Sequence, residues 1–156
     1  MEGKLRYGAV VLLLIIVALI TSCSSSGPPD PKSAVISFFG AMEKDDKAAL
    51  AHLLDLPELM KTINEDYALQ TDSPRVFTNP IDVLEDLTGE GLTKKRWFSL
   101  QRIIGATEVT GESATVEVTF VDKNSSRGYL TKFGLHIKNG KWRIYSFKTF
   151  QEAAGP

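Results

Sequence analysis

The hydrophobic period of this chain changes once, and that change limits the folds it can adopt. Up to about Leu87, apolar residues recur at helical spacing, as in Ala34, Val35 and Phe38. From Trp97 onward they alternate with polar residues, as in the stretch 114–120, which is typical of half-buried strands. Helices followed by an antiparallel meander predict an α+β fold, with N-terminal helices packed on a curved sheet of about four strands.

Capping residues and prolines mark the expected helix starts in the first half of the chain. Asp30-Pro31 and Asn79-Pro80 each place a capping side chain before a proline at the first helical position. Asp46 can cap another helix, and Pro57 opens one more. The stripes of Phe, Leu and Met on these segments favour packing in a core over binding of a cofactor.

Turn residues set the register of the first two expected strands. The turn at 110–113 places Val109 opposite Ala114, so strict alternation puts Ile103 on the inward face as well. A slip by one residue would bury Glu117, so we expect this register to be well specified.

Asn139-Gly140 is the strongest hairpin signal in the chain. A two-residue turn there places Leu135 opposite Ile144, and these residues are predicted to face inward with Phe133 and Trp142. Along the outward face lie the residues of a possible interaction surface: His136, Arg143, Tyr145 and Phe147. Tyr145 is expected to cover Gly134 with its ring. The outward apolar Phe147 indicates either a β-bulge or a contact surface.

The first 22 residues have the order of a secretion signal. Lys4 and Arg6 precede an apolar run from Gly8 to Ile20, which is followed by small residues and Cys23. A spanning helix needs about 20 apolar residues, so this run is short for an uncleaved anchor, which remains the alternative. Because Cys23 is the single cysteine of the sequence, no intramolecular disulfide can form.

Ile20-Thr21-Ser22-Cys23 resembles the lipobox of bacterial lipoproteins. In that family the cysteine takes a diacylglycerol thioether, the leader is cut before it, and the new amine is often acylated, for example with palmitate. The resemblance implies a signal peptide over 1–22 and membrane attachment through lipid on Cys23. Residues 23–29, rich in Ser, Gly and Pro, are then a flexible tether. Since Ser24 is not Asp, the same resemblance favours the periplasmic face of the outer membrane if the cell is Gram-negative.

Three parts of the remaining chain together resemble the nuclear-transport-factor-2-like (NTF2-like, cystatin-like) cone. These are the opening amphipathic helix, the glycine-turn hairpin of 107–120 and the closing stretch 139–144. In that fold a curved sheet wraps a long N-terminal helix, and here it would cover residues 30–150, leaving 151–156 as a disordered tail. An apolar pocket in such a cone would be lined by aromatic residues, for which the candidates are Phe38, Trp97, Tyr129, Phe133 and Trp142. Filling the core is the alternative use of such residues.

We expect no catalytic residue inside the cone, although enzymes of the NTF2-like family carry Asp, His or Tyr there. The predicted register puts no Asp, Glu or His on the inward face of any strand. His136 faces outward beside Arg143, where we expect it to be solvated and out of reach of the pocket. With only His52 as a second histidine and no other cysteine near it, neither a metal nor a cofactor is expected.

The charge of the chain excludes some partners. A formal net charge of −1 does not favour nucleic acid. The one basic run, Lys94-Lys95-Arg96, is predicted to mark the solvated entry to the first strand, with binding of an anionic surface as the minor alternative.

Together these patterns favour a lipid-anchored cell-envelope protein that is not an enzyme. Its domain is expected to bind a small apolar ligand or to scaffold an envelope protein. Two alternatives stay open: a small pocket enzyme of the dehydratase or isomerase kind, and a module that forms a homodimer through the outer sheet face.

Overall fold

The computed structural model describes residues 30–70, 76–125 and 127–151. The predicted signal peptide, Cys23 and the tether lie outside these ranges. Within them, five helices precede four strands: α2 (Pro31–Glu43), α3 (Lys47–Leu53), α4 (Leu56–Gln70), α5 (Pro80–Asp86), α6 (Leu92–Phe98), β1 (Gln101–Thr110), β2 (Ser113–Val121), β3 (Gly128–Lys138) and β4 (Lys141–Gln151). The strands form one antiparallel sheet in the order β1-β2-β3-β4. The predicted α+β fold is confirmed.

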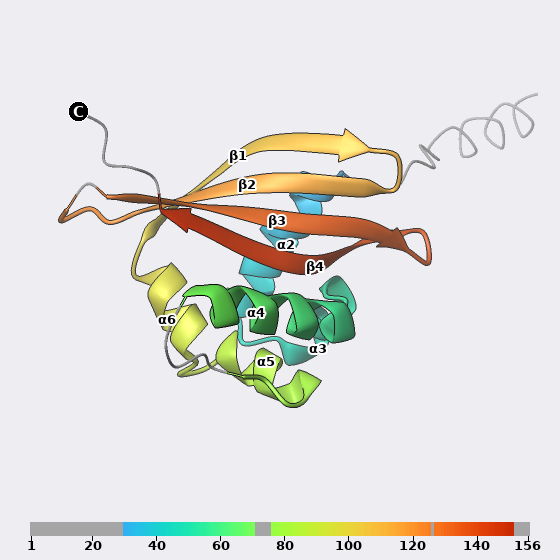
Figure 1. Ribbon diagram of the computed structural model, residues 1–156, viewed down its shortest axis with the longest axis horizontal. Coiled ribbons are helices and arrows are strands. Elements are labelled where there is room, and N and C mark those ends of the chain that lie inside the picture. Colours follow the sequence, from blue (N-terminus) through green and yellow to red (C-terminus); the bar gives the residue numbers. More distant parts are fainter. Residues whose placement is uncertain (1–29, 71–75, 126, 152–156) are drawn as a thin grey trace, which may run out of the picture.

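The helices lie against one face of the sheet (Figure 1). In this view α2 crosses behind the strands and the green and yellow helices α3 to α6 lie below them. Among the described residues, no helix has the length and hydropathy that a membrane span requires. The last residue of β4, Gln151, pairs with Tyr129 in the sheet, whereas the prediction counted it in the tail; residues 152–156 lie outside the described residues.

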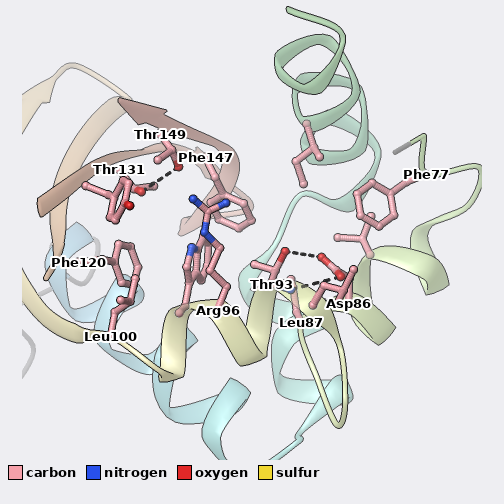
Figure 2. A pocket seen from close by; sticks show the side chains of 15 residues that line it. Phe77, Asp86, Leu87, Thr93, Arg96, Leu100, Phe120, Thr131, Phe147 and Thr149 are labelled. Atoms are coloured by element: carbon pink, nitrogen blue, oxygen red, sulfur yellow. Dashed lines mark hydrogen bonds between the residues drawn. The ribbon is translucent and has the colours of Figure 1, made fainter. Parts of the chain in front are cut away.

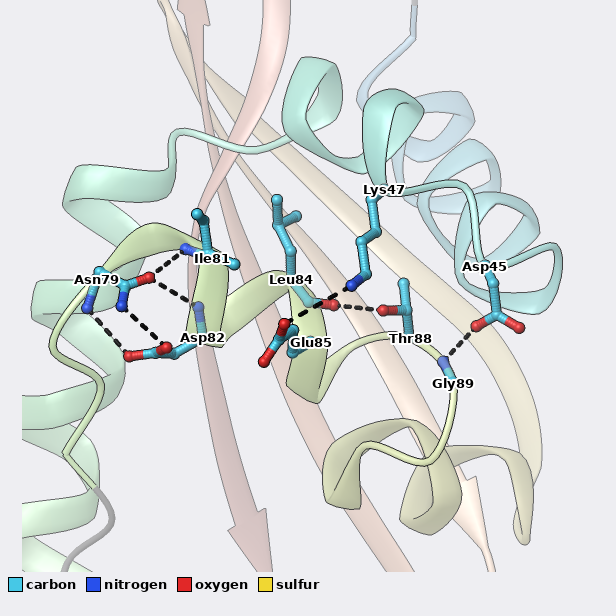
Figure 3. Close-up of polar contacts among 9 residues, drawn as sticks. All are labelled: Asp45, Lys47, Asn79, Ile81, Asp82, Leu84, Glu85, Thr88 and Gly89. Carbon is cyan, nitrogen blue, oxygen red and sulfur yellow. Dashed lines mark hydrogen bonds and ion pairs between the residues drawn. The ribbon is translucent and has the colours of Figure 1, made fainter.

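The helix starts predicted from capping residues are confirmed. The side chain of Asp30 accepts a hydrogen bond from the backbone N–H of Lys32, and that of Asp46 accepts one from Ala49 at 2.9 Å. Asn79 and Asp82 form a reciprocal capping box at the start of α5 (Figure 3). These bonds satisfy N–H groups that the first turn of a helix leaves without a partner.

The sequence did not reveal α6, and two predictions failed with it. Trp97 lies in this helix and not at the start of a strand, since β1 begins only at Gln101. Lys94, Lys95 and Arg96 likewise belong to α6. A seven-residue helix shows only two turns of periodicity, which is too little to separate from an alternating pattern.

A β-bulge in β1 overturns the predicted placement of Ile103. Val109 pairs with Ala114 as predicted, but the register shifts between Ile104 and Thr107. Beyond the shift Ile103 pairs with Thr119 on the outer face and is 50% exposed. Arg102 turns inward instead, with its guanidinium 4.0 Å from the centre of the Phe98 ring. Burial there lowers the pKa of Arg102.

A second irregularity, in β4, settles the position of Phe147. Leu135 pairs with Ile144 as predicted, but the next pair is Gly134 with Ser146, so Tyr145 is the extra residue. Phe147 therefore pairs with Phe133 on the inward face and is only 9% exposed. The β-bulge reading of Phe147 is correct, and its place in an outward interaction surface is wrong.

Aromatic side chains fill the space between α2, α6 and the sheet. Their rings pack mostly edge to face, which is a favourable arrangement, and their centroids lie 5.0–6.2 Å apart. The members of this aromatic core are Phe38, Phe39, Trp97, Phe120, Phe133 and Phe147. All six are buried.

Candidate functional site

A cavity of about 310 Å³ opens at the end of the aromatic core, between the sheet and helices α4 to α6 (Figure 2). This volume is at the lower end of the range of small-molecule sites, about 300–1,000 Å³. Its apolar lining consists of Ile63, Phe77, Val83, Leu87, Leu92, Trp97, Leu100, Phe120 and Phe147. Its other lining residues are Asp86, Thr93, Arg96, Tyr129, Thr131 and Thr149.

Polar contacts hold the helical wall of the cavity in place. The cap at Asn79 starts α5, which supplies Val83 and Asp86. After α5, the backbone N–H of Gly89 donates to the carboxylate of Asp45 (Figure 3). Lys94 of α6 donates to the same carboxylate at 2.6 Å, and this hydrogen bond is the main reason that the pKa of Asp45 lies below its usual value. The turn after α2 thus anchors both helices of the wall.

The carboxylate of Asp86 corrects the expectation of an interior without proton-transfer groups. Asp86 is 4% exposed, and its oxygens accept hydrogen bonds from the hydroxyl and the backbone N–H of Thr93. The prediction considered only the strands, whereas Asp86 is the last residue of helix α5. Its neighbours in the sequence, Glu85 and Leu87, gave no signal that the carboxylate would point inward.

Two threonines form the polar part of the sheet wall. Thr131 of β3 and Thr149 of β4 are paired in register, and their hydroxyl oxygens lie 3.0 Å apart. Thr131 is fully buried on the same strand face as Phe133. The hydroxyl pair forms one hydrogen bond internally and leaves one hydroxyl hydrogen, as well as lone pairs, for a ligand.

Arg96 lies between these two polar groups. Figure 2 shows its guanidinium in the middle of the cavity, with the Thr131–Thr149 pair on one side and the Thr93–Asp86 pair on the other. The guanidinium carbon is 5.7 Å from the centre of the Tyr129 ring, a distance at which a cation and an aromatic face attract. The side chain as a whole is exposed, so Arg96 also borders the opening.

The five aromatic candidates for pocket lining divide into two groups. Trp97 and Tyr129 line the cavity. Phe38 and Phe133 are fully buried in the aromatic core, and Trp142 is buried at the other end of the sheet, where its indole nitrogen has no hydrogen-bond partner among the described residues. Sequence alone could not separate the groups, because all five occupy inward positions and only the helices decide what covers each one.

On the outer face, His136 pairs with Arg143 as predicted, but the expectation that it is simply solvated is wrong. Its Nε2 lies 3.0 Å from a carboxylate oxygen of Asp55, which also accepts a hydrogen bond from Lys138 at 2.7 Å. Asp55 is 7% exposed, and it reaches the sheet because its backbone N–H donates to Ile144 of β4. Burial alone would raise the pKa of Asp55, but the hydrogen bonds and charges of Lys138 and His136 outweigh it, so that pKa is lowered.

The proposed outer interaction face keeps fewer members than predicted. Tyr145 stacks on His136 with ring centroids 5.0 Å apart, and its ring covers Gly134 as predicted. Arg143, which pairs with His136 across the strands, is half-buried. With Phe147 in the core, the homodimer through this face stays a prediction, and sedimentation velocity tests it.

Within the described ranges, no three His, Cys, Asp or Glu side chains are grouped closely enough to hold a metal ion. His52 is exposed on α3.

Comparison with protein-family models gave no match, and comparison with curated protein sequences gave none either. Solved structures that resemble the chain include an NTF2-like protein of unknown function from Silicibacter pomeroyi, with 16% identity, 77% of this chain and 91% of that one covered, and a TM-score of 0.45. Another is an NTF2-like family protein from Streptomyces avermitilis named as a candidate dehydratase, with 18% identity, 78% of this chain and 93% of that one covered, and a TM-score of 0.48. A third is an NTF2-like protein of unknown function from Cytophaga hutchinsonii, with 11% identity, 79% of this chain and 90% of that one covered, and a TM-score of 0.40. At such low identities and TM-scores, these structures do not indicate what the chain binds.

Proposed function

We propose that this protein is a lipid-anchored cell-envelope protein whose domain binds a small, mostly apolar molecule without transforming it. The lipid anchor is supported by the sequence around Cys23 alone. The binding role is supported by one observation, the cavity of about 310 Å³ beside the aromatic core. Protein interiors are packed closely and seldom leave a space much larger than a few water molecules, so a cavity of this size suits an occupant.

The lining of the cavity suits a ligand with a large apolar part. Nine of its fifteen lining residues carry apolar side chains, and these would shield the ligand from water. The few polar groups lie at defined places, the Thr131–Thr149 pair, Thr93 with Asp86, and Arg96. Such an arrangement fixes the orientation of a ligand while apolar contact supplies most of the affinity.

Native mass spectrometry of the full chain tests the proposal. Protein isolated from membranes is measured before and after incubation with an organic extract of the cell envelope. Leu100→Trp would fill the cavity, and Leu130→Trp makes the same change at a position of β3 outside its lining. We expect a retained small molecule on the wild type and on Leu130→Trp, but not on Leu100→Trp. A bare mass for all three proteins, or equal retention by Leu100→Trp, contradicts the proposal.

The anchor is tested on the same material. Peptide mapping is expected to recover a chain that begins at a lipid-modified Cys23. Recovery of unmodified Cys23 still joined to residues 1–22 rules the anchor out and leaves the binding proposal untouched.

A pocket enzyme of the dehydratase or isomerase kind is the second candidate, because the carboxylate of Asp86 lines the cavity. A general base must come within hydrogen-bond reach of the proton that it removes, and Asp86 is the acidic residue placed to do so among the described lining residues. If a molecule in the envelope extract is converted by the wild type and not by Asp86→Asn, which should still bind it, the enzyme replaces the carrier. Unchanged extract composition rejects this candidate.

A further inference from the structure

The three consecutive cations of α6 make different contacts. The ammonium of Lys94 pairs with Asp45 at 2.6 Å, and that of Lys95 pairs with Glu90, also at 2.6 Å. Arg96 forms no ion pair with a carboxylate of the described residues, and its guanidinium lies over the face of the Tyr129 ring. Two of the three charges thus stabilise the helix and its surroundings, while the third is directed to the cavity.

The surroundings of Arg96 favour binding of an anion. Arg96 itself is exposed at the opening, but a ligand that fills the cavity beside it would reduce its contact with water, and a charge pair is worth more where there is less water. A guanidinium also presents N–H groups in a planar fork that matches the two oxygens of a carboxylate. The Thr131–Thr149 pair lines the same cavity, and because one of its two hydroxyl hydrogens is used between the threonines, the other is left to donate one hydrogen bond to a carboxylate.

The lining limits the number of anionic groups that the cavity accepts. The carboxylate of Asp86 already takes one side, opposite the threonine pair, where Thr93 holds it by hydrogen bonds. A second negative group on the ligand would lie against the apolar side chains, where it loses its water without a hydrogen bond in return. One anionic group at Arg96 and an uncharged remainder fit these constraints.

We propose that the ligand of this cavity is an amphiphilic monocarboxylate, whose carboxylate binds Arg96 and whose apolar body lies against Trp97, Leu100 and Phe120. This inference rests on the proposed binding function and adds the chemical class of the ligand. It also assigns Arg96 as the residue that selects an anion over a neutral molecule of the same shape.

Probes that share one chain and differ in their end group test this assignment. Octanoate, octanol and octylamine are titrated into the full chain reconstituted in lipid nanodiscs, and binding is read from the rise in the thermal unfolding midpoint, which grows with ligand concentration over Kd. We expect octanoate to bind about tenfold or more tightly than octanol, the range of a charge-assisted hydrogen-bonded pair. Octylamine is expected to bind most weakly.

Substitutions in α6 locate the source of the preference. Arg96→Gln is expected to bring octanoate down to the affinity of octanol and to leave octanol binding unchanged, which also shows that the cavity is still formed. Arg96→Lys keeps the charge without the planar fork, so we expect an intermediate affinity. Lys95→Gln is the matched control, because it removes one positive charge from the next position, where the ammonium pairs with Glu90. It should leave the preference for octanoate intact.

Two results would overturn the assignment. The first is equal stabilisation by octanoate and octanol, or none by octanoate. The second is an octanoate preference that survives Arg96→Gln or is lost equally in Lys95→Gln, since the preference would then come from the general charge of the protein. In both cases the native mass measurement decides the binding function separately. A retained small molecule on the wild type would still support binding, and a bare mass would contradict both proposals.

Discussion

The two ends of the inward face of β3 belong to the same strand and differ in their surroundings. One end is buried in the core, and the other borders the cavity. At the hairpin end, which we call the closed end, Leu135 and Ile144 pair and are fully buried together with Leu50 of α3. At the other end, which we call the open end, Tyr129 and Thr131 face the cavity. The same sheet runs through both ends, with one register shift in β4 between them. The covering helices therefore decide which part becomes core and which becomes a site.

A direct link between chain segments distinguishes the closed end. Leu54 forms a parallel bridge with Ile144, and the next residue, Asp55, donates its backbone N–H to Ile144 at 2.8 Å. These bonds draw the α3–α4 junction against the edge of the sheet. At the open end the covering helices α5 and α6 have seven residues each and present Asp86, Thr93 and Arg96 toward the sheet. Polar side chains cannot fill that space without losing hydrogen bonds, and a cavity remains.

The largest effect is expected in the aromatic core that separates the two ends. Phe133 is fully buried, and its ring contacts those of Phe38 and Phe147 at 5.8 and 5.0 Å. Phe133→Ala should lower the free energy of unfolding by about 3–5 kcal/mol, because it removes contacts and leaves a void. Leu100→Ala at the open end should cost under about 1 kcal/mol, since that side chain already borders empty space. Urea unfolding measures both, and similar losses would mean that the two ends are packed alike.

Gly134 gives the next largest effect. A Cβ there would clash with the Ser146 hydroxyl and lie 3.0 Å from the Tyr145 ring, so Gly134→Ala requires these two side chains at the bulge of β4 to move. We expect a loss of about 1–3 kcal/mol. Gly105→Ala is the matched control on β1, where the nearest atom is 3.5 Å away. If thermal unfolding shows the same small loss of stability for both variants, the packing around Gly134 is not tighter than that around Gly105.

Asp55 gives a pH-dependent difference at the closed end. Its pKa in the folded protein is below the ordinary value of 3.8, so its contribution to stability is complete above about pH 5 and disappears as the pH falls through the lowered pKa. Asp55→Asn should cost about 1–2 kcal/mol near neutral pH, a moderate figure because Lys138 is half exposed.

In urea unfolding at a series of pH values, the gap between wild type and Asp55→Asn should therefore narrow below pH 3.8. A gap that stays constant down to acid pH would show that the charge of Asp55 contributes nothing.

The smallest effects come from one helix cap at each end. Asp46 caps α3 at the closed end, and Asn79 caps α5 at the open end. Each change to Ala should lower the free energy of unfolding by about 1 kcal/mol. Only Asn79→Ala should also weaken octanoate binding, because α5 forms a wall of the cavity. Equal binding by both variants would show that the cavity does not depend on that cap.

Local sequence signals predicted much of the fold because their causes are local. Asn79-Pro80 starts a helix wherever it lies, since the side chain bonds to N–H groups two and three residues away. Asn139-Gly140 likewise fixes the pairing of the residues that flank it. Farther from the turns the strands shift register at bulges, and this is where the inward or outward placement of Ile103 and Phe147 was wrong.

The sequence by itself determined the change from helices to strands, the helix starts, the hairpin turns and the α+β class, because each depends on residues a few positions apart. Tertiary structure alone decided which inward residues line a cavity and which neighbours share a charge. Asp55 meets His136 across 81 positions of sequence, and Lys94, Lys95 and Arg96 are adjacent yet contact different partners. Such contacts depend on how the helices dock on the sheet, and no local pattern contains that geometry.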